Sequence, residues 1–179
     1  IRQTQQLLET IDWKPVVRAL ETAGGIALYG SVFSASALQP FYYELQYLGR
    51  RAHLLTSADD MTVWASYCPR DELSIFVSYS GRAGVVHRAA KILANRGLRG
   101  IAITSDLKSP LAHAATWALP VARTEDPETM DRMSHVGSVM ASMYVLSVMY
   151  GLLFGSDTDQ NSHLRTQGYY RARAVVDKD

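Results

Sequence analysis

Five short apolar stretches, each separated from the next by a helical pattern, most constrain how this chain can fold. They span residues 26–29, 52–55, 73–77, 100–104 and 117–121. Apolar runs of this length, bounded by turn signals, are typical of strands buried on both faces. Strands that alternate with helices over short links form a parallel sheet with helices on both of its faces. The sequence therefore predicts an α/β fold with three layers, α/β/α, around a five-stranded parallel sheet.

A common order for five such strands is the flavodoxin-like order 2-1-3-4-5. In that order the first and third strands are neighbours, and the connections that leave them diverge. Ligands bind at such a switch point, beyond the C-terminal ends of the strands. The loops there are Gly30–Ser34 and Ser78–Arg82, and both contain serine and glycine. We therefore expect a binding site between these two loops.

The third strand and its loop, Leu73–Gly84, combine features that suit an anion. The strand breaks into Ser78-Tyr79-Ser80-Gly81 before a helical pattern, which places unpaired helix amides beside two hydroxyls. Gly81 lets the backbone approach a ligand closely. A simpler interpretation is that the serines only cap the following helix, since serine and glycine are common at such turns. The local sequence leaves both interpretations open.

Helical patterns also precede and follow the first predicted strand. Thr4–Ala23 is expected to be helical, with Asp12 able to cap a second segment within it. The next helix is expected over Ala37–Leu48. Pro40 has no amide hydrogen, so this prediction requires that it lie in the first turn.

The C-terminal third is expected to form a long helix from about Arg132 to Phe154, a polar break over Gly155–Asn161 and a tail that one more helix could form. Val136 to Phe154 carries no charge and is about as long as a minimal membrane span. Its serines, glycines and tyrosines favour a helix buried in the core or in an oligomer interface. The predicted divisions are a helical segment over 1–24, a ligand-binding domain over 25–155 and a tail over 156–179.

Composition excludes several classes of protein. The chain has 179 residues and a formal net charge of +1, and no block of Lys and Arg indicates that it binds nucleic acid itself. Its single cysteine, Cys68, excludes an internal disulfide framework and is typical of a reducing compartment, so we expect a cytoplasmic location. No GxGxxG follows a strand and no histidines have metal-ligand spacing, so neither cofactor nor metal is predicted. Because the chain begins at Ile1 rather than Met, we expect a piece of a longer protein.

Three motifs, in order along the chain, carry a resemblance to a known family. They are Ser78-Tyr79-Ser80-Gly81, Ile103-Thr104-Ser105 and Ser109-Pro110-Leu111-Ala112. Together they resemble the sugar isomerase (SIS) domain over residues 11–151. The sequence is most similar to the ligand-sensing half of RpiR/MurR-type bacterial transcription regulators. The resemblance implies the SIS fold and a phosphosugar bound in the crevice.

The resemblance also implies which residues bind the phosphosugar: Ser31, Ser34, Ser78, Ser80, Gly81 and Arg82, with Thr104 and Ser105 at the rim. Two positions depart from the family pattern. Val32 replaces a glycine, which hinders close approach of the backbone, and Ala83 replaces a threonine, which removes a hydroxyl. Arg82 either compensates through charge-assisted bonds to phosphate or points to solvent.

Three functions are compatible with these residues. A sensor would bind a phosphosugar without turning it over and signal to a DNA-binding helix-turn-helix domain that is not in this chain. A sugar-phosphate isomerase needs a base, usually Glu or His; the two loops contain neither, although His135 could reach the site. A degenerate dimerisation module is favoured by Val32 and Ala83.

We expect the sensor, with no catalytic residue, assembled as a homo-oligomer. In this hypothesis ligand phosphate bridges the two loops, stiffens the crevice and shifts subunit orientation. A crevice filled by the Val32 and Phe33 side chains would leave only the dimerisation module.

Overall fold

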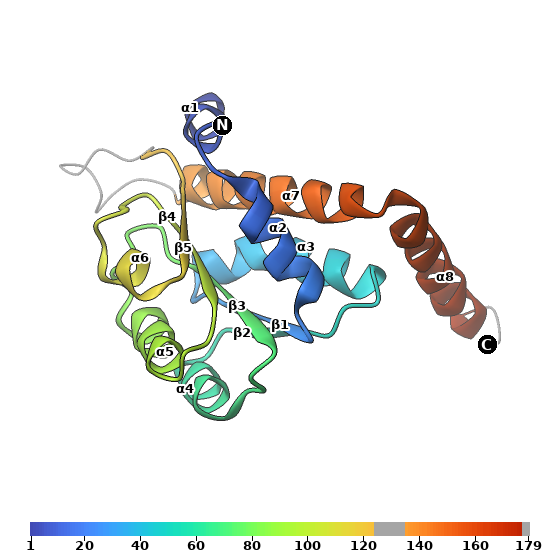
Figure 1. Cartoon of the computed structure of the whole chain (residues 1–179), viewed down its shortest axis with the longest axis horizontal. Coiled ribbons are helices and arrows are strands. Elements are labelled where there is room, and N and C mark those ends of the chain that lie inside the picture. The colour runs from blue at the N-terminus through green and yellow to red at the C-terminus, as the bar shows by residue number, and fades with distance from the viewer. Residues whose placement is uncertain (124–134, 177–179) are drawn as a thin grey trace.

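A five-stranded parallel sheet runs through the computed structural model, which describes residues 1–123 and 135–176 (Figure 1). The strands are β1 (Gly25–Tyr29), β2 (Ala52–Leu55), β3 (Glu72–Val77), β4 (Gly100–Thr104) and β5 (Trp117–Pro120). Their order is β2-β1-β3-β4-β5, and every neighbouring pair is parallel. The predicted sheet and strand order are confirmed.

Helices cover both faces of the sheet, each layer over its own apolar core (Figure 1). One core includes side chains from α1 (Arg2–Leu8), α2 (Trp13–Thr22), α3 (Phe33–Tyr47) and α7 (Val136–Ser156). The other includes side chains from α4 (Ala58–Tyr67), α5 (Gly84–Asn95) and α6 (Pro110–Ala114). The last helix, α8 (Thr158–Val176), follows α7 and projects away from the sheet.

Successive residues of the central strands enter opposite cores. Ile75 and Val77 of β3 lie in the core beneath α3 and α7, whereas Phe76 between them lies in the core beneath α4 and α5. Because both faces are buried, the strands are continuous apolar runs rather than alternating ones. β1 and β3 pair as far as Tyr29 and Phe76, so the loops that follow them begin side by side.

The N-terminal helical segment forms two helices, as the position of Asp12 indicated. Its carboxylate accepts a hydrogen bond from the Lys14 amide at 3.1 Å and caps α2. α1 is tied to the body by Thr4, which is buried and whose hydroxyl accepts from the Ala122 amide at 3.1 Å, directly after β5.

The prediction for the next helix is wrong in one respect. α3 begins at Phe33 rather than Ala37, so Pro40 lies in its interior. Proline there leaves the carbonyl of Ser36 without its helical donor. Both residues are exposed, so water can satisfy that carbonyl, which explains why the helix continues through Pro40.

The predicted polar break over 155–161 is also wrong. α7 continues to Ser156 and α8 begins at Thr158. The polar residues act as caps: the buried Asn161 amide donates to the carbonyls of Leu153 and Phe154 at 3.1 Å each, and Asp157 accepts from the Gln160 amide. The predicted start of the long helix at Arg132 lies outside the described residues.

By length and composition, α7 could cross a membrane, with a mean hydropathy of 1.7 in its most apolar window. It instead packs on α2 and α3 and places Ala141, Val145 and Met149 in the core. Only 39% of that window is buried, and Val136 and Met140 are exposed. A core helix with one open apolar side therefore accounts for the composition.

Candidate functional site

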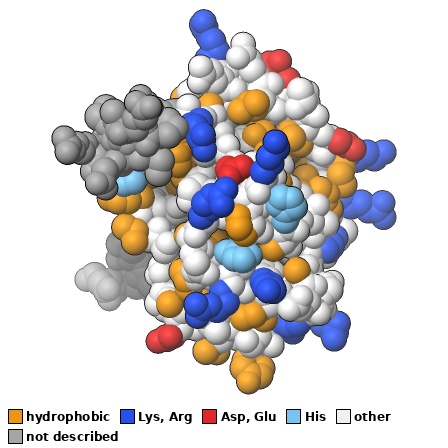
Figure 2. Space-filling view, turned by 90° about the vertical axis from the view of Figure 1, so that its left-hand side faces the viewer, with side chains coloured by type: hydrophobic (Ala, Val, Ile, Leu, Met, Phe, Trp, Pro, Cys, Tyr) orange, Lys and Arg blue, Asp and Glu red, His pale blue; other side chains and the backbone are white. Residues whose placement is uncertain are grey.

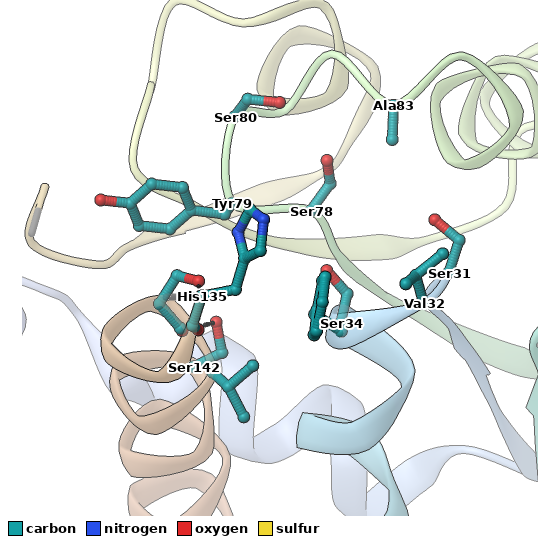
Figure 3. A pocket seen from close by; sticks show the side chains of 12 residues that line it. Ser31, Val32, Ser34, Ser78, Tyr79, Ser80, Ala83, His135 and Ser142 are labelled. Carbon is teal, nitrogen blue, oxygen red and sulfur yellow. Dashed lines mark hydrogen bonds between the residues drawn. The ribbon is translucent and has the colours of Figure 1, made fainter. Parts of the chain in front are cut away.

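A cavity of about 200 Å³ opens beyond the C-terminal ends of β1 and β3. Its walls are the β1–α3 loop, the β3–α5 loop and the first turns of α7 (Figure 3). The described residues that line it are Ser31, Val32, Phe33, Ser34, Ser78, Tyr79, Ser80, Ala83, His135, Ser138, Val139 and Ser142. Drug-sized ligands occupy roughly 300–1,000 Å³. The smaller volume here suits one sugar ring.

The Val32 and Phe33 side chains do not fill this cavity. They are 74% and 52% exposed, and the space between the loops stays open. The crevice is therefore not filled by these side chains, which was the condition that would have left only a dimerisation module.

Four predicted ligand residues, all serines, line the cavity from two loops. Ser31 and Ser34 lie at the start of α3, and Ser78 and Ser80 follow β3 (Figure 3). Ser78 is only 4% exposed. The hydroxyls of Ser31, Ser34 and Ser78 make no hydrogen bond to any described residue, so they are available to a ligand.

The two helices that begin beside these serines have no side-chain cap. The N-cap of α3 is Val32 and that of α5 is Ala83. In contrast, Asp12, Ser57 and Ser109 cap α2, α4 and α6. The interpretation that the serines of the β3 loop merely cap the next helix therefore does not hold for α5. At the start of α3, the Ser34 amide donates to the Ser31 carbonyl at 3.0 Å and the Ala35 amide donates to the Val32 carbonyl at 3.2 Å. The partial positive charge of both helix N-termini remains at the cavity.

The β3–α5 loop is fixed by the loop that follows β4. The Tyr79 carbonyl accepts hydrogen bonds from the Thr104 hydroxyl at 3.0 Å, the Ser105 hydroxyl at 2.9 Å and the Ser105 amide at 2.8 Å. Gly81 has a φ of 65°, and a Cβ there would lie 2.1 Å from the Ser109 hydroxyl oxygen. Gly81, Thr104 and Ser105 are not part of the cavity lining and instead position the loop that is.

Arg82 also lies outside the lining. Its guanidinium forms a 2.9 Å ion pair with Asp106, and its side chain is 63% exposed. A backbone hydrogen bond from Lys108 and the charges of Arg82 and Arg123 lower the pKa of Asp106. Figure 2 views the side from which α3 and α7 begin, where Lys and Arg side chains gather around a small acidic area. The Lys and Arg side chains on this face of the molecule favour the approach of anions.

The α7 wall of the cavity contains residues that sequence reasoning missed or set aside. His135 stacks on Phe33 with ring centroids 4.4 Å apart, which joins the start of α7 to the start of α3. Ser138, Val139 and Ser142 complete this wall. Two serines four residues apart on an uncharged helix were the available signal, because that spacing places both on one face.

Val32 has backbone angles that suit glycine. Its φ is 50° and its ψ is −117°. Among the residues that the structure describes, Val32 is the only non-glycine residue with a positive φ. A β-branched residue is strongly disfavoured there. These angles agree with the expectation from the family pattern that a glycine would suit this position.

The lining combines hydroxyls, helix N-termini and one imidazole, and its described part contains no Asp, Glu, Lys or Arg. Within residues 1–123 and 135–176, no group of three His, Cys, Asp or Glu side chains could hold a metal ion. Backbone amides and hydroxyls can bind a phosphate at such a place without a cation. The arrangement is thus suited to an anionic ester with a small neutral body.

Comparisons with known proteins agree with this architecture. An uncharacterized HTH-type transcriptional regulator of Haemophilus influenzae is 24% identical over 159 residues, which cover 89% of this chain and 54% of that protein. The chain therefore spans about half the length of that curated relative. Vibrio vulnificus NanR complexed with ManNAc-6P has a TM-score of 0.83 at 22% identity, covering 98% of this chain and 65% of that one.

The sugar isomerase domain of an RpiR transcription factor from Sphaerobacter thermophilus has a TM-score of 0.78 at 21% identity and covers 92% of this chain and 90% of that one. A sugar-phosphate isomerase function has been inferred for similar structures from Listeria monocytogenes and Methanococcus jannaschii. The SIS domain family model matches residues 20–153. The chain belongs to the SIS domain family.

Proposed function

We propose that this chain is the effector-binding SIS domain of an RpiR-type transcription regulator and that it binds a phosphosugar without turning it over. One observation carries the proposal: free serine hydroxyls and two helix N-termini without side-chain caps surround one small cavity at the switch point of the sheet. The regulator from Haemophilus influenzae and the NanR and RpiR structures support the same role. DNA binding would belong to a helix-turn-helix domain outside this sequence, and the protein would act in the cytoplasm.

The phosphate would lie between the β1–α3 and β3–α5 loops. Ser31, Ser34, Ser78 and Ser80 would donate hydroxyl hydrogens to it, together with the first amides of α5. Gly81, Thr104 and Ser105 would act by holding the β3 loop in shape. Arg82 would contribute at longer range, because its guanidinium is paired with Asp106 at the surface.

Isomerisation is the second candidate, and His135 favours it. An isomerase needs a base within hydrogen-bond reach of the proton it removes. His135 lies in the cavity wall, where the described lining offers no carboxylate. Its ring stacks on Phe33, which suits a residue that shapes the cavity. We therefore place the sensor first.

Calorimetry with a panel of sugar monophosphates, ManNAc-6P included, tests the proposal. We expect at least one ligand to bind and to be recovered unchanged after prolonged incubation, as judged by NMR. Conversion of a bound aldose phosphate to its ketose would identify an isomerase. If no sugar phosphate and no inorganic phosphate binds, the dimerisation module is the remaining candidate function.

Ser78→Ala tests the position of the phosphate. A hydrogen bond to a charged group contributes about 1.5–3 kcal/mol, so Kd should rise roughly 10- to 150-fold. Ser74→Ala is the matched control, because Ser74 lies on β3, the strand that Ser78 directly follows. Ser74 is 1% exposed against 4% for Ser78, and it does not line the cavity. Equal affinities for the two variants would show that the phosphate lies elsewhere.

We also propose that the chain forms a homodimer through the open side of α7. Val136 and Met140 are 60% and 53% exposed there. A Cβ added at Gly151 or Gly155 would meet no atom within 4 Å, so a second helix could approach closely. Light scattering should show a dimer at micromolar concentration that Met140→Lys dissociates. Val63→Lys, at an apolar residue 58% exposed on α4, should leave the dimer intact.

A further inference from the structure

The cavity has two chemically different sides. One side carries the loop serines and the N-termini of α3 and α5, and it attracts negative charge. The other side is the flank of α7, where Ser138, Val139 and Ser142 face the same space. The following inference rests on the proposed function, since it assumes that a phosphate occupies the first side.

The two serines of the α7 flank already use their only hydrogen. The Ser138 hydroxyl donates to the His135 carbonyl at 2.8 Å, and the Ser142 hydroxyl donates to the Ser138 carbonyl at 2.9 Å (Figure 3). Both residues are buried, with exposures of 5% and 2%. A serine hydroxyl has one hydrogen and two acceptor lone pairs. Towards the cavity, each of these hydroxyls is therefore an acceptor only.

An acceptor-only wall restricts what can lie against it. An O–H or N–H group of a ligand gains a hydrogen bond from Ser138 or Ser142 without disturbing the helix. A carboxylate or second phosphate would face oxygen lone pairs, and no cationic side chain of the described lining compensates it. A buried anion without partners is costly. Val139, between the two serines in sequence, adds apolar surface that cannot solvate such a charge.

We propose that Ser138 and Ser142 determine specificity, by selecting sugar phosphates whose far end is neutral and bears hydrogen-bond donors and by rejecting those with a second anionic group. The side with the loop serines determines the affinity for the phosphate ester, and the α7 side contacts the rest of the ligand. The ligand class is therefore a monophosphate of a neutral sugar or sugar alcohol, not a bisphosphate or a phosphorylated sugar acid.

The test compares two probes of equal chain length. Sorbitol 6-phosphate and 6-phosphogluconate differ at one end, where an alcohol replaces a carboxylate. Calorimetry with the intact chain should give at least tenfold tighter binding of sorbitol 6-phosphate. Ser142→Ala should weaken binding of sorbitol 6-phosphate about fivefold to tenfold, since one neutral hydrogen bond is lost. Binding of inorganic phosphate, which touches only the other side, should change less than twofold.

Ser147→Ala is the matched control. Ser147 lies on the same helix and donates to the Met143 carbonyl at 2.9 Å, but it is exposed and outside the lining. Serine-to-alanine changes favour a helix, so both variants should fold. The inference is overturned if the two probes bind equally, if Ser142→Ala behaves as Ser147→Ala does, or if both probes bind no more tightly than phosphate. If the unmodified chain binds neither probe, no other sugar phosphate and no inorganic phosphate, the proposed function is overturned, and the inference with it.

Discussion

Val32 offers a direct measure of the strain held in the β1–α3 loop. Its φ of 50° and ψ of −117° are readily adopted by glycine and disfavoured for a β-branched residue. A residue held in such a region costs about 1–3 kcal/mol. Its side chain is 74% exposed, so removing it forfeits little apolar burial. Val32→Gly should therefore relieve strain at almost no cost in packing.

The opposing term is the conformational entropy of glycine in the unfolded chain. It costs about 0.5–1 kcal/mol, so the net gain in the free energy of unfolding is centred near 1 kcal/mol, with an upper limit of about 2.5 kcal/mol. For a chain of this size, 1 kcal/mol corresponds to a rise in Tm of about 2–4 °C. Urea denaturation gives the free energy and differential scanning calorimetry gives Tm.

Val63→Gly is the control for this prediction. Val63 is 58% exposed in the regular helix α4, where the same substitution should lower stability by about 0.5 kcal/mol. The opposite signs of the two changes are the signature of strain at residue 32. If Val32→Gly is less stable than the unmodified chain, the backbone argument is wrong. If Val32→Ala, which keeps a Cβ, gains as much as glycine does, side-chain branching rather than the sign of φ is responsible.

Three further predictions concern the supports of the site and the core. Gly81→Ala should destabilise the fold by several kcal/mol in urea titration, because the new Cβ would lie 2.1 Å from the Ser109 hydroxyl oxygen at a φ of 65°. Asn161→Ala should cost about 1–3 kcal/mol in thermal unfolding, since two carbonyls at the end of α7 lose their buried donor. Burial raises the pKa of Glu72 above 4.5, so the native state holds its proton more tightly than the unfolded state does. Stability should therefore fall as pH rises from about 4.5 towards the folded pKa, and Glu72→Gln should flatten that pH dependence; an unchanged profile would contradict it.

The sheet could be predicted from the sequence because both faces of its strands are buried. Ile75, Phe76 and Val77 must all be apolar when alternate residues enter two cores, so the strand stands out as a run. The start of α3 could not be predicted, because helix initiation at Phe33 depends on the positive φ of Val32, which no propensity scale favours. Local rules failed where the backbone is strained.

Within the site, the contribution of each loop was predictable and the third wall was not. Ser31, Ser34, Ser78 and Ser80 follow strands whose order fixes them near one another. Ser138 and Ser142 come from a helix that begins far along the chain, and their approach depends on how α7 packs on α3. Thr104 and Ser105 were expected at the rim, yet their hydroxyls are committed to the Tyr79 carbonyl. The identity of a residue could be inferred more easily than the direction of its hydroxyl.

Locally unfavourable features occur together at this cavity, whereas α2, α4 and α6 begin with side-chain caps. A missing N-cap costs about 0.5–2 kcal/mol for each of α3 and α5, and the strain at Val32 adds about 1–3 kcal/mol. Together these are a substantial part of the 5–15 kcal/mol that a typical domain has in total. A ligand present at about 100 times its Kd stabilises the native state by about 2.7 kcal/mol, which is of the same size. An anion bound at these helix N-termini would offset part of that cost, so ligand binding would stabilise the two loops that form the cavity.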